Sequence, residues 1–194
     1  TLNNLKLYEV DTMILNTKDY GIPQNRKRLF IIGRRKDCIL DALKEPRKVG
    51  KCAGIVKYMD RLNLKISRET HPKLYRRMPC EMHKEKYNKL RKKYDVKYLT
   101  KHPIVTDLGS SVGFPTDAYD CSPTLRAVRS SLWVTCLKRK MHVRESLALQ
   151  GFPRSFKIVV SENQMLKQIG NSMSVNVLTH LFREIFRKTN VTVN

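Results

Sequence analysis

The chain has 194 residues, 41% of them hydrophobic, which suits a globular protein of one or two domains and excludes a disordered chain. Lysine and arginine number 39 against 17 acidic residues, a formal net charge of +22, so we expect a polyanionic partner, nucleic acid before an anionic membrane. The sequence has no apolar run long enough to span a membrane, no signal-peptide pattern and five cysteines without framework spacing, and therefore predicts an intracellular protein with reduced thiols.

Two β-strands are predicted near the start of the chain. Residues 7–15 carry a strand pattern, and a loop with Gly21 and Pro23 joins them to the apolar run of residues 29–32. Four consecutive apolar residues are typical of a strand that is buried on both faces. The polar residues before this run are therefore expected at the mouth of the strand.

Arg26 and Arg28 lie two residues apart in this polar stretch. In extended chain they point to the same side and, beside the amide of Gln24, would form a fork for phosphate or for a base edge. The alternative is an edge strand with solvated arginines.

The middle of the chain is basic and weakly periodic. Residues 81–94 predict a helix, whose lysines form either a solvated face or a set of phosphate contacts. From His102 onward, short runs rich in Ser, Gly and Pro predict short strands and loops that adapt to a partner.

Regular structure is predicted again from Val143. A short helix ends at Gly151, residues 156–160 are a strand candidate, and the Ser-x-x-Gln pattern at Ser161 predicts the start of a helix that ends at Gly170. A last helix begins near residue 174, with one apolar stripe facing a core: Val175, Leu178, Leu181, Phe182, Ile185 and Phe186.

Three stretches of the chain together resemble the DNA cytosine-C5 methyltransferases. Residues 20–33 are similar to the eighth conserved motif, with its Gln-x-Arg-x-Arg signature. Residues 144–153, Arg-Glu-x-x-x-x-Gln-Gly-Phe-Pro, resemble the ninth motif, and residues 168–175, with Gln-x-Gly-Asn-Ser, resemble the tenth. The motifs occur in family order, with a long variable insert between the eighth and ninth.

The resemblance implies an α/β fold, the C-terminal portion of a Rossmann-like methyltransferase sheet plus a small mixed target-recognition domain. Residues 1–36 would be the last strands of the catalytic domain and residues 37–140 the target-recognition domain. Residues 141–194 would return to the catalytic domain with the closing helix.

The same resemblance implies roles for single residues in gripping a base. Arg28 is similar to the arginine that bonds the flipped cytosine near its O2, and Arg26 to the one that helps to hold the catalytic loop and base pocket. Gln24 would lie beside the extruded nucleotide.

Further roles concern the DNA sequence and the cofactor. In the insert, the Thr-Leu pair resembles one that closes many recognition domains, which makes the nearby arginines candidates for phosphate or guanine contacts. The implied DNA-binding residues here are Thr124, Leu125, Arg126 and Arg129. Asn171, Ser172 and the backbone of Met173 would line the pocket for S-adenosylmethionine.

C5 methylation also needs a thiolate for C6 and a carboxylic acid at N3 of the flipped cytosine. In the family these come from Pro-Cys and Glu-Asn-Val motifs before the eighth motif, and none precedes Tyr20 here. Pro79-Cys80 lies in the insert without the following Gln and is expected to be structural. Cys80-x-x-His83 lacks a partner at zinc spacing, so no metal is expected.

We therefore expect the C-terminal part, or the second subunit, of a DNA (cytosine-5)-methyltransferase. It would bind double-stranded DNA and be inactive without an N-terminal half carrying the catalytic Cys. One alternative is a basic nucleic-acid-binding protein with no methylation role. Another is an RNA cytosine-5 methyltransferase of the same family.

Overall fold

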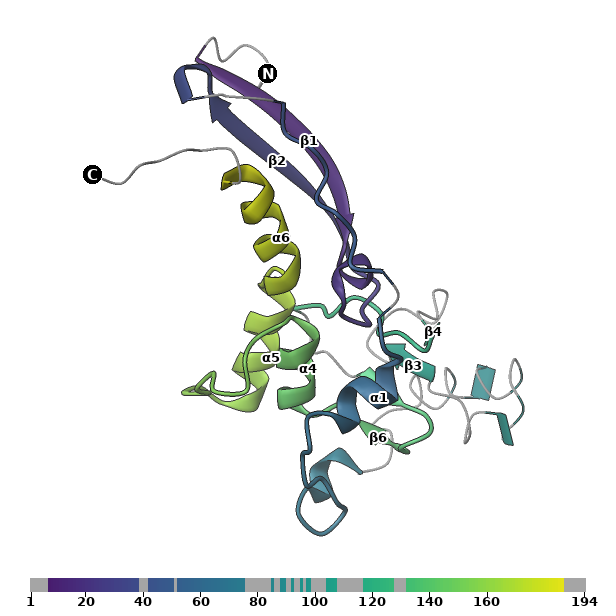
Figure 1. Cartoon of the computed structure of the whole chain (residues 1–194). Helices are drawn as coiled ribbons and strands as arrows, with labels where there is room; N and C mark the ends of the chain where they lie inside the picture. The colour runs from purple at the N-terminus through teal and green to yellow at the C-terminus, as the bar shows by residue number, and fades with distance from the viewer. Residues whose placement is uncertain are drawn as a thin grey trace.

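A computed structural model shows a long β-hairpin that rises from a body of short helices and strands, with the last helix against the hairpin (Figure 1). Helix α6 thus stands alongside the hairpin, above α4 and α5 in this view. The described residues are 7–38, 42–50, 52–75, 85, 88–89, 92, 95, 97–98, 104–107, 117–127 and 132–186.

Strands β1 (Tyr8–Asn16) and β2 (Lys27–Arg35) form the hairpin, in antiparallel register from the Tyr8–Arg35 pair to the Asn16–Lys27 pair. A 3-10 turn, η2 (Thr17–Tyr20), follows β1 and ends at Gly21, whose φ of +85° favours glycine. The predicted strand pair is confirmed. Within the described residues this sheet has two strands, so each of them is an edge strand.

Helix α6 (Val175–Phe186) packs on one face of the hairpin. The predicted stripe is confirmed for Leu178, Leu181 and Ile185, whereas Phe182 and Phe186 are exposed. Five buried residues form this contact, which we name the hairpin core: Leu15, Tyr20, Phe30, Val177 and Leu181.

The opposite face of the hairpin is apolar and exposed. Ile14, Leu29 and Ile31 are 67%, 60% and 51% exposed, and we name them the outer face. The prediction that residues 29–32 are buried on both faces is therefore wrong. Side chains alternate between the two faces of a strand, and α6 covers only the face that holds Phe30.

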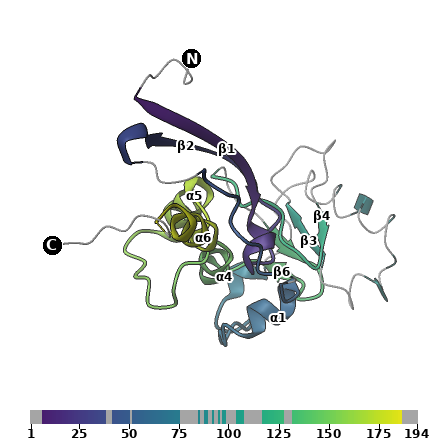
Figure 2. The ribbon, with the colours of Figure 1, turned by 45° about the horizontal axis from the view of Figure 1, so that its top comes forward.

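The body of the molecule is built around a four-stranded antiparallel sheet of order β4-β3-β5-β6 (Figure 2). Its strands are β3 (Ile104–Asp107), β4 (Asp117–Tyr119), β5 (Leu132–Val134) and β6 (Arg139–Lys140). The helices are α1 (Ile55–Asp60), α4 (Val143–Leu149) and α5 (Glu162–Asn171), with 3-10 turns η3 (Lys36–Cys38) and η4 (Pro72–Leu74).

A second hydrophobic cluster, which we name the central core, holds these elements together. This cluster has members in each of the three segments suggested by the sequence, residues 1–36, 37–140 and 141–194. It joins a residue of the hairpin loop to residues of the sheet and of α4 and α5. Its members are Ile22, Ile55, Met59, Val105, Leu125, Leu132, Val134, Met141, Val143, Leu147, Leu149, Met165 and Ile169.

Local sequence signals fix the ends of α4 and α5. The side chain of His142 accepts from the amide of Arg144 while Glu145 bonds back to the His142 amide, a capping box. Gly151 follows α4 with a φ of +82°, as the predicted helix end requires. Ser161 accepts from the Gln164 amide at the start of α5, which continues one residue past the predicted end at Gly170.

Two predicted elements differ from the structure or lie outside it. Residues 156–160 are irregular rather than a strand, since the Phe156 carbonyl accepts from Arg144 and the Phe156 ring packs on Phe152. The predicted helix at residues 81–94 falls mostly outside the described residues. No helix in the described part of the chain is long and apolar enough to cross a membrane.

Candidate functional site

Arg26 joins the eighth motif to the insert and to the tenth motif. Its side chain is buried, with 4% of the residue exposed, and its Nη1 donates to the Leu125 carbonyl at 2.7 Å. Nη2 donates to the carbonyls of Gly170 at 3.1 Å and Ser172 at 2.8 Å. Burial, with a smaller contribution from Arg28, lowers the pKa of Arg26 to about 10, so the guanidinium stays charged at neutral pH.

Arg28, two residues on, is exposed instead. Its Nη1 donates to the Lys27 carbonyl at 2.7 Å. The predicted two-arginine fork is therefore wrong, because the Arg26 guanidinium is already occupied by backbone carbonyls. Arg26 precedes the first residue of β2, so the alternation of the strand does not set its direction. Arg28 remains the accessible cation of the pair.

Gln24 is fully buried, and its Nε2 donates to the Leu149 carbonyl at 3.0 Å. Its backbone forms a short parallel bridge with Ser122. The predicted contact of Gln24 with an extruded nucleotide conflicts with this burial, because the side chain has no exposed surface. Gln24 instead links the hairpin loop to the end of α4 through this hydrogen bond.

Gln150 is a second buried amide, to which the sequence pattern gave no role beyond its motif. The side-chain Nε2 of Gln150 donates to the Ile169 carbonyl at 3.0 Å. The main-chain carbonyl of Gln150 accepts from the Val175 amide at 2.8 Å. Gln150 thereby connects α4 to the end of α5 and the start of α6. The sequence feature that could have indicated this role is the position of Gln150 directly before Gly151, which ends the helix.

The predicted DNA-binding residues of the insert divide into surface and interior positions. Thr124 is half-buried and donates to the Asn25 carbonyl at 2.9 Å, and Leu125 is buried in the central core. The Arg126 side chain is 42% exposed and pairs with the buried Asp107 carboxylate at 2.7 Å. Thr124 and Arg126 therefore reach the surface, Leu125 does not, and Arg129 lies outside the described residues.

The predicted cofactor residues follow the end of α5. Asn171 and Met173 are exposed, while the hydroxyl of Ser172 donates to the Ile169 carbonyl at 2.7 Å. The Ser172 carbonyl is held by Arg26. An amide and an apolar side chain are thus presented on a backbone that two hydrogen bonds fix, which suits polar contacts and packing against a nucleoside.

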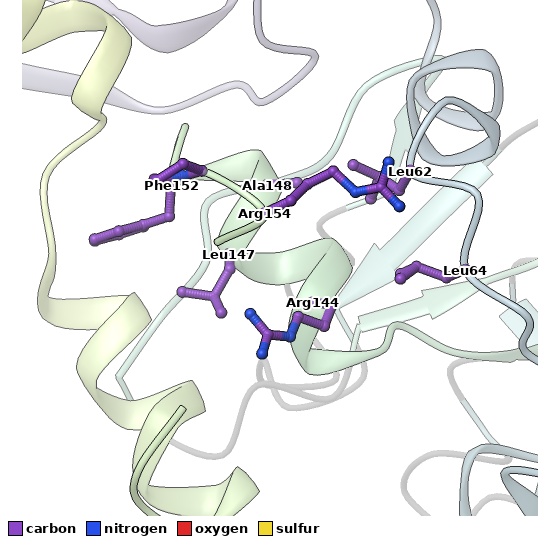
Figure 3. A pocket seen from close by; sticks show the side chains of 8 residues that line it. Leu62, Leu64, Arg144, Leu147, Ala148, Phe152 and Arg154 are labelled. Atoms are coloured by element: carbon purple, nitrogen blue, oxygen red, sulfur yellow. The ribbon is translucent and has the colours of Figure 1, made fainter. Parts of the chain in front are cut away.

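A cavity of about 250 Å³ lies away from this site, between α4 and the loop after α1. Figure 3 shows Arg144 and Arg154 with apolar side chains around it. The cavity is separate from the candidate site, because none of its lining residues is a predicted site residue. They are Leu62, Leu64, Arg144, Leu147, Ala148, Phe152, Pro153 and Arg154.

The described cysteine side chains do not have the character of a nucleophile. Burial raises the pKa of Cys52 and Cys136, and raises that of Cys121 to about 11. An activated cysteine needs the opposite shift. Cys80 lies outside the described residues. Among the described residues, no group of three or more His, Cys, Asp or Glu could hold a metal ion.

Comparison with known proteins gives consistent matches. The family model for C-5 cytosine-specific DNA methylase matches residues 1–187. Type II methyltransferase M.HaeII of Haemophilus aegyptius is 29% identical over 186 residues, 95% of this chain and 52% of that protein. M.HhaI of Haemophilus parahaemolyticus is 27% identical over 181 residues, 93% of this chain and 54% of that protein. The chain spans about half the length of these curated relatives.

Solved methyltransferases share the fold. A putative DNA modification methyltransferase encoded within a prophage of E. coli has a TM-score of 0.56 at 21% identity, over 93% of this chain and 60% of that one. The S. pombe Dnmt2 methyltransferase has a TM-score of 0.53 at 19% identity, over 93% of this chain and 57% of that one.

Proposed function

Because the chain belongs to the C-5 cytosine-specific DNA methylase family, we propose that it is the part of a DNA (cytosine-5)-methyltransferase that reads the target and holds the flipped cytosine. The observation that carries this proposal is that Arg26 of the eighth motif bonds both the insert, at the Leu125 carbonyl, and the tenth motif, at the carbonyls of Gly170 and Ser172. One buried side chain thereby holds the candidate base, target and cofactor regions together.

Arg28 is the proposed contact to the base. A cytosine inside the duplex cannot be reached at C5 and C6, so the base must leave the stack. The O2 of the flipped base is an acceptor, and Arg28 is an exposed guanidinium at the start of β2 with donors to offer. Arg26 is a positioning residue, since it is buried and its Nη1 and Nη2 already bind the protein backbone.

The target is read by residues of the insert. Thr124 and Arg126 reach the surface beside the hairpin loop, and Arg129 is retained from the sequence as a third candidate. Asp107 sets the direction of the Arg126 guanidinium, and arginine is well suited to a guanine edge or a phosphate. The net charge of +22 favours binding of a polyanion along this surface.

S-adenosylmethionine is the methyl donor of C-5 cytosine methyltransferases. We assign part of its pocket to Asn171, Ser172 and Met173. The exposed amide of Asn171 is available for hydrogen bonds, and the exposed Met173 side chain offers apolar contact. Ser172 is held from both sides, by Ile169 and by Arg26, and so keeps its neighbours in place.

The catalytic thiol is proposed to come from polypeptide outside these 194 residues. The raised pKa values of Cys52, Cys121 and Cys136 argue against each of them as the nucleophile. The curated relatives are about twice as long as the chain, which leaves room for a Pro-Cys and a Glu-Asn-Val motif in the remainder.

The outer face is the proposed surface on which this remaining polypeptide packs. Ile14, Leu29 and Ile31 form an exposed apolar strip on a two-stranded sheet, and such a sheet alone is of marginal stability in water. Phe182 and Phe186 add a second exposed apolar strip on α6, with ring centroids 6.0 Å apart. A sheet continued from the hairpin, with a layer on each side, would cover both strips.

The test is methyl transfer from radiolabelled S-adenosylmethionine to duplex DNA, with and without a polypeptide that carries the missing motifs. We expect transfer only from the mixture, and activity of these 194 residues alone would contradict the division of labour. Transfer to RNA with none to duplex DNA would favour the RNA alternative.

Arg28→Ala in the mixture separates chemistry from binding. We expect turnover to fall by roughly a hundredfold or more, the usual loss when a donor to the reacting group is removed. Affinity for duplex DNA should change little. Arg35→Ala, at the exposed far end of β2, is the matched control and should leave turnover unchanged. Equal losses of binding and turnover would place Arg28 on the DNA backbone instead.

A further inference from the structure

The recognition segment and the end of α5 are joined by one planar group. Nη1 of Arg26 binds the carbonyl of Leu125, which stands between the two surface candidates for DNA contact. Nη2 of the same guanidinium binds the carbonyls of Gly170 and Ser172, which flank the cofactor candidate Asn171. A displacement of the Leu125 carbonyl must therefore be followed by the loop at 170–172, or a buried hydrogen bond is broken.

Gly170 makes a second and independent contact between the same two segments. A Cβ at this position would lie 2.2 Å from the Ala127 amide nitrogen and 2.4 Å from the Arg126 carbonyl oxygen. The backbone of α5 thus lies directly against the backbone that follows Leu125. No side chain fits between them, so the two backbones are in direct contact.

We propose that binding of duplex DNA at Thr124 and Arg126 and binding of the methyl donor at residues 171–173 favour each other, with Arg26 and Gly170 as the positioning residues that transmit the coupling. This inference rests on the proposed function, which assigns the two sites. Such coupling is reciprocal, because the change that DNA makes in donor affinity must equal the change that the donor makes in DNA affinity.

Only an arginine can hold this junction. The guanidinium places its donors in a fixed plane, so that one cation reaches three carbonyls from two segments. A lysine at this position keeps the charge but has a single, flexible ammonium. Arg26→Lys should therefore preserve much of the local electrostatics and lose the geometric link.

Hydrogen exchange on the full 194-residue chain, with and without a mixed-sequence DNA duplex, tests the coupling directly. In the wild type we expect the duplex to slow amide exchange at 125–127 and also at 170–173, each by about fivefold or more. In Arg26→Lys and in Gly170→Ala the slowing at 125–127 should persist, and the slowing at 170–173 should be lost. Arg35→Lys, in the exposed pair with Asp37, is the control and should behave as the wild type.

The other outcomes separate this inference from the proposed function. Slowing in the wild type that is confined to 125–127 would overturn the coupling and leave DNA recognition intact, whatever the variants do. Slowing at both segments in both variants would show that neither residue transmits it. No slowing at 125–127 in the wild type would contradict the proposed DNA contact, and the coupling with it.

Discussion

The hairpin core and the central core differ in how completely they are enclosed. The central core has a four-stranded sheet and three helices around it, and it also encloses an ion pair, Arg139 with Glu145 at 2.6 Å. The hairpin core has two strands and α6, and the same strands expose Ile14, Leu29 and Ile31 on their other side. The central core is therefore enclosed on all the sides that its elements provide, whereas the hairpin is covered on one face only within the described residues.

The largest effect is expected from breaking the enclosed ion pair. Arg139→Met leaves the Glu145 carboxylate buried without its cation and should lower the free energy of unfolding by about 3–5 kcal/mol. Urea unfolding followed by the fluorescence of Trp133, the one tryptophan of the chain, measures this. The exposed Arg35–Asp37 pair gives the control, since Arg35→Met should change stability by less than about 0.5 kcal/mol.

Phe30→Ala tests the hairpin core. Phe30 packs with Leu181 and Val177, and its removal should lower the free energy of unfolding by about 3 kcal/mol. The loss should be seen in the circular dichroism transition more than in Trp133 fluorescence, because Trp133 lies in β5 of the other sheet. Equal shifts of both signals would mean that the two cores unfold as one unit.

Acid should weaken the central core first. Burial, together with the nearby His71 and Arg139 and against the pull of Glu145, lowers the pKa of His142. The folded state therefore binds fewer protons, so the stabilisation is complete above the unfolded pKa of about 6.5 and is lost as pH falls through the folded pKa. Besides the cost of charging a buried ring, the loss includes the N-cap hydrogen bond, worth about 1 kcal/mol, because protonated Nδ1 cannot accept from the Arg144 amide.

His142→Asn is the matched variant for this pH effect. Asparagine keeps an acceptor at the cap position and does not titrate. Unfolding in urea at a series of pH values from 7.5 to 5 should give a shallower loss of stability for the variant than for the wild type. Parallel curves would show that other groups govern the acid response.

The smallest effect is expected next to Phe30, on the outer face. Ile31→Ala should change the free energy of unfolding by less than about 0.5 kcal/mol, because Ile31 is half exposed and packs on nothing that α6 supplies. It should nonetheless weaken association with the complementary polypeptide, as measured by calorimetric titration. A loss of stability as large as that of Phe30→Ala would mean that the outer face is already covered.

The elements that the sequence predicted correctly depend on local signals. The hairpin follows from two apolar runs around Gly21, and α4 and α5 from caps within a few residues of their ends. The strand predicted at 156–160 is absent because an apolar run needs a neighbouring strand, which the sequence does not specify.

The site was predicted less completely than the fold, for a physical reason. The motifs identified Arg26 and Gln24 by type, but their partners are backbone carbonyls 99 to 146 residues away, which carry no signature of their own. Burial of Gln24 and the close approach at Gly170 arise only when the segments meet. Arg28 and Arg126 are exposed and remain candidates for the contacts that the sequence suggested.

The two edge strands of the hairpin have a consequence for handling the protein. Within the described residues no third strand pairs with β1 or β2, so we expect a strand from another molecule to add to either edge, and the apolar outer face favours stacking of such pairs. At high concentration the chain should therefore form aggregates through strand addition despite its charge. A second polypeptide that covers the outer face would prevent this association during expression. Co-expression of the two is therefore the practical route to a soluble sample.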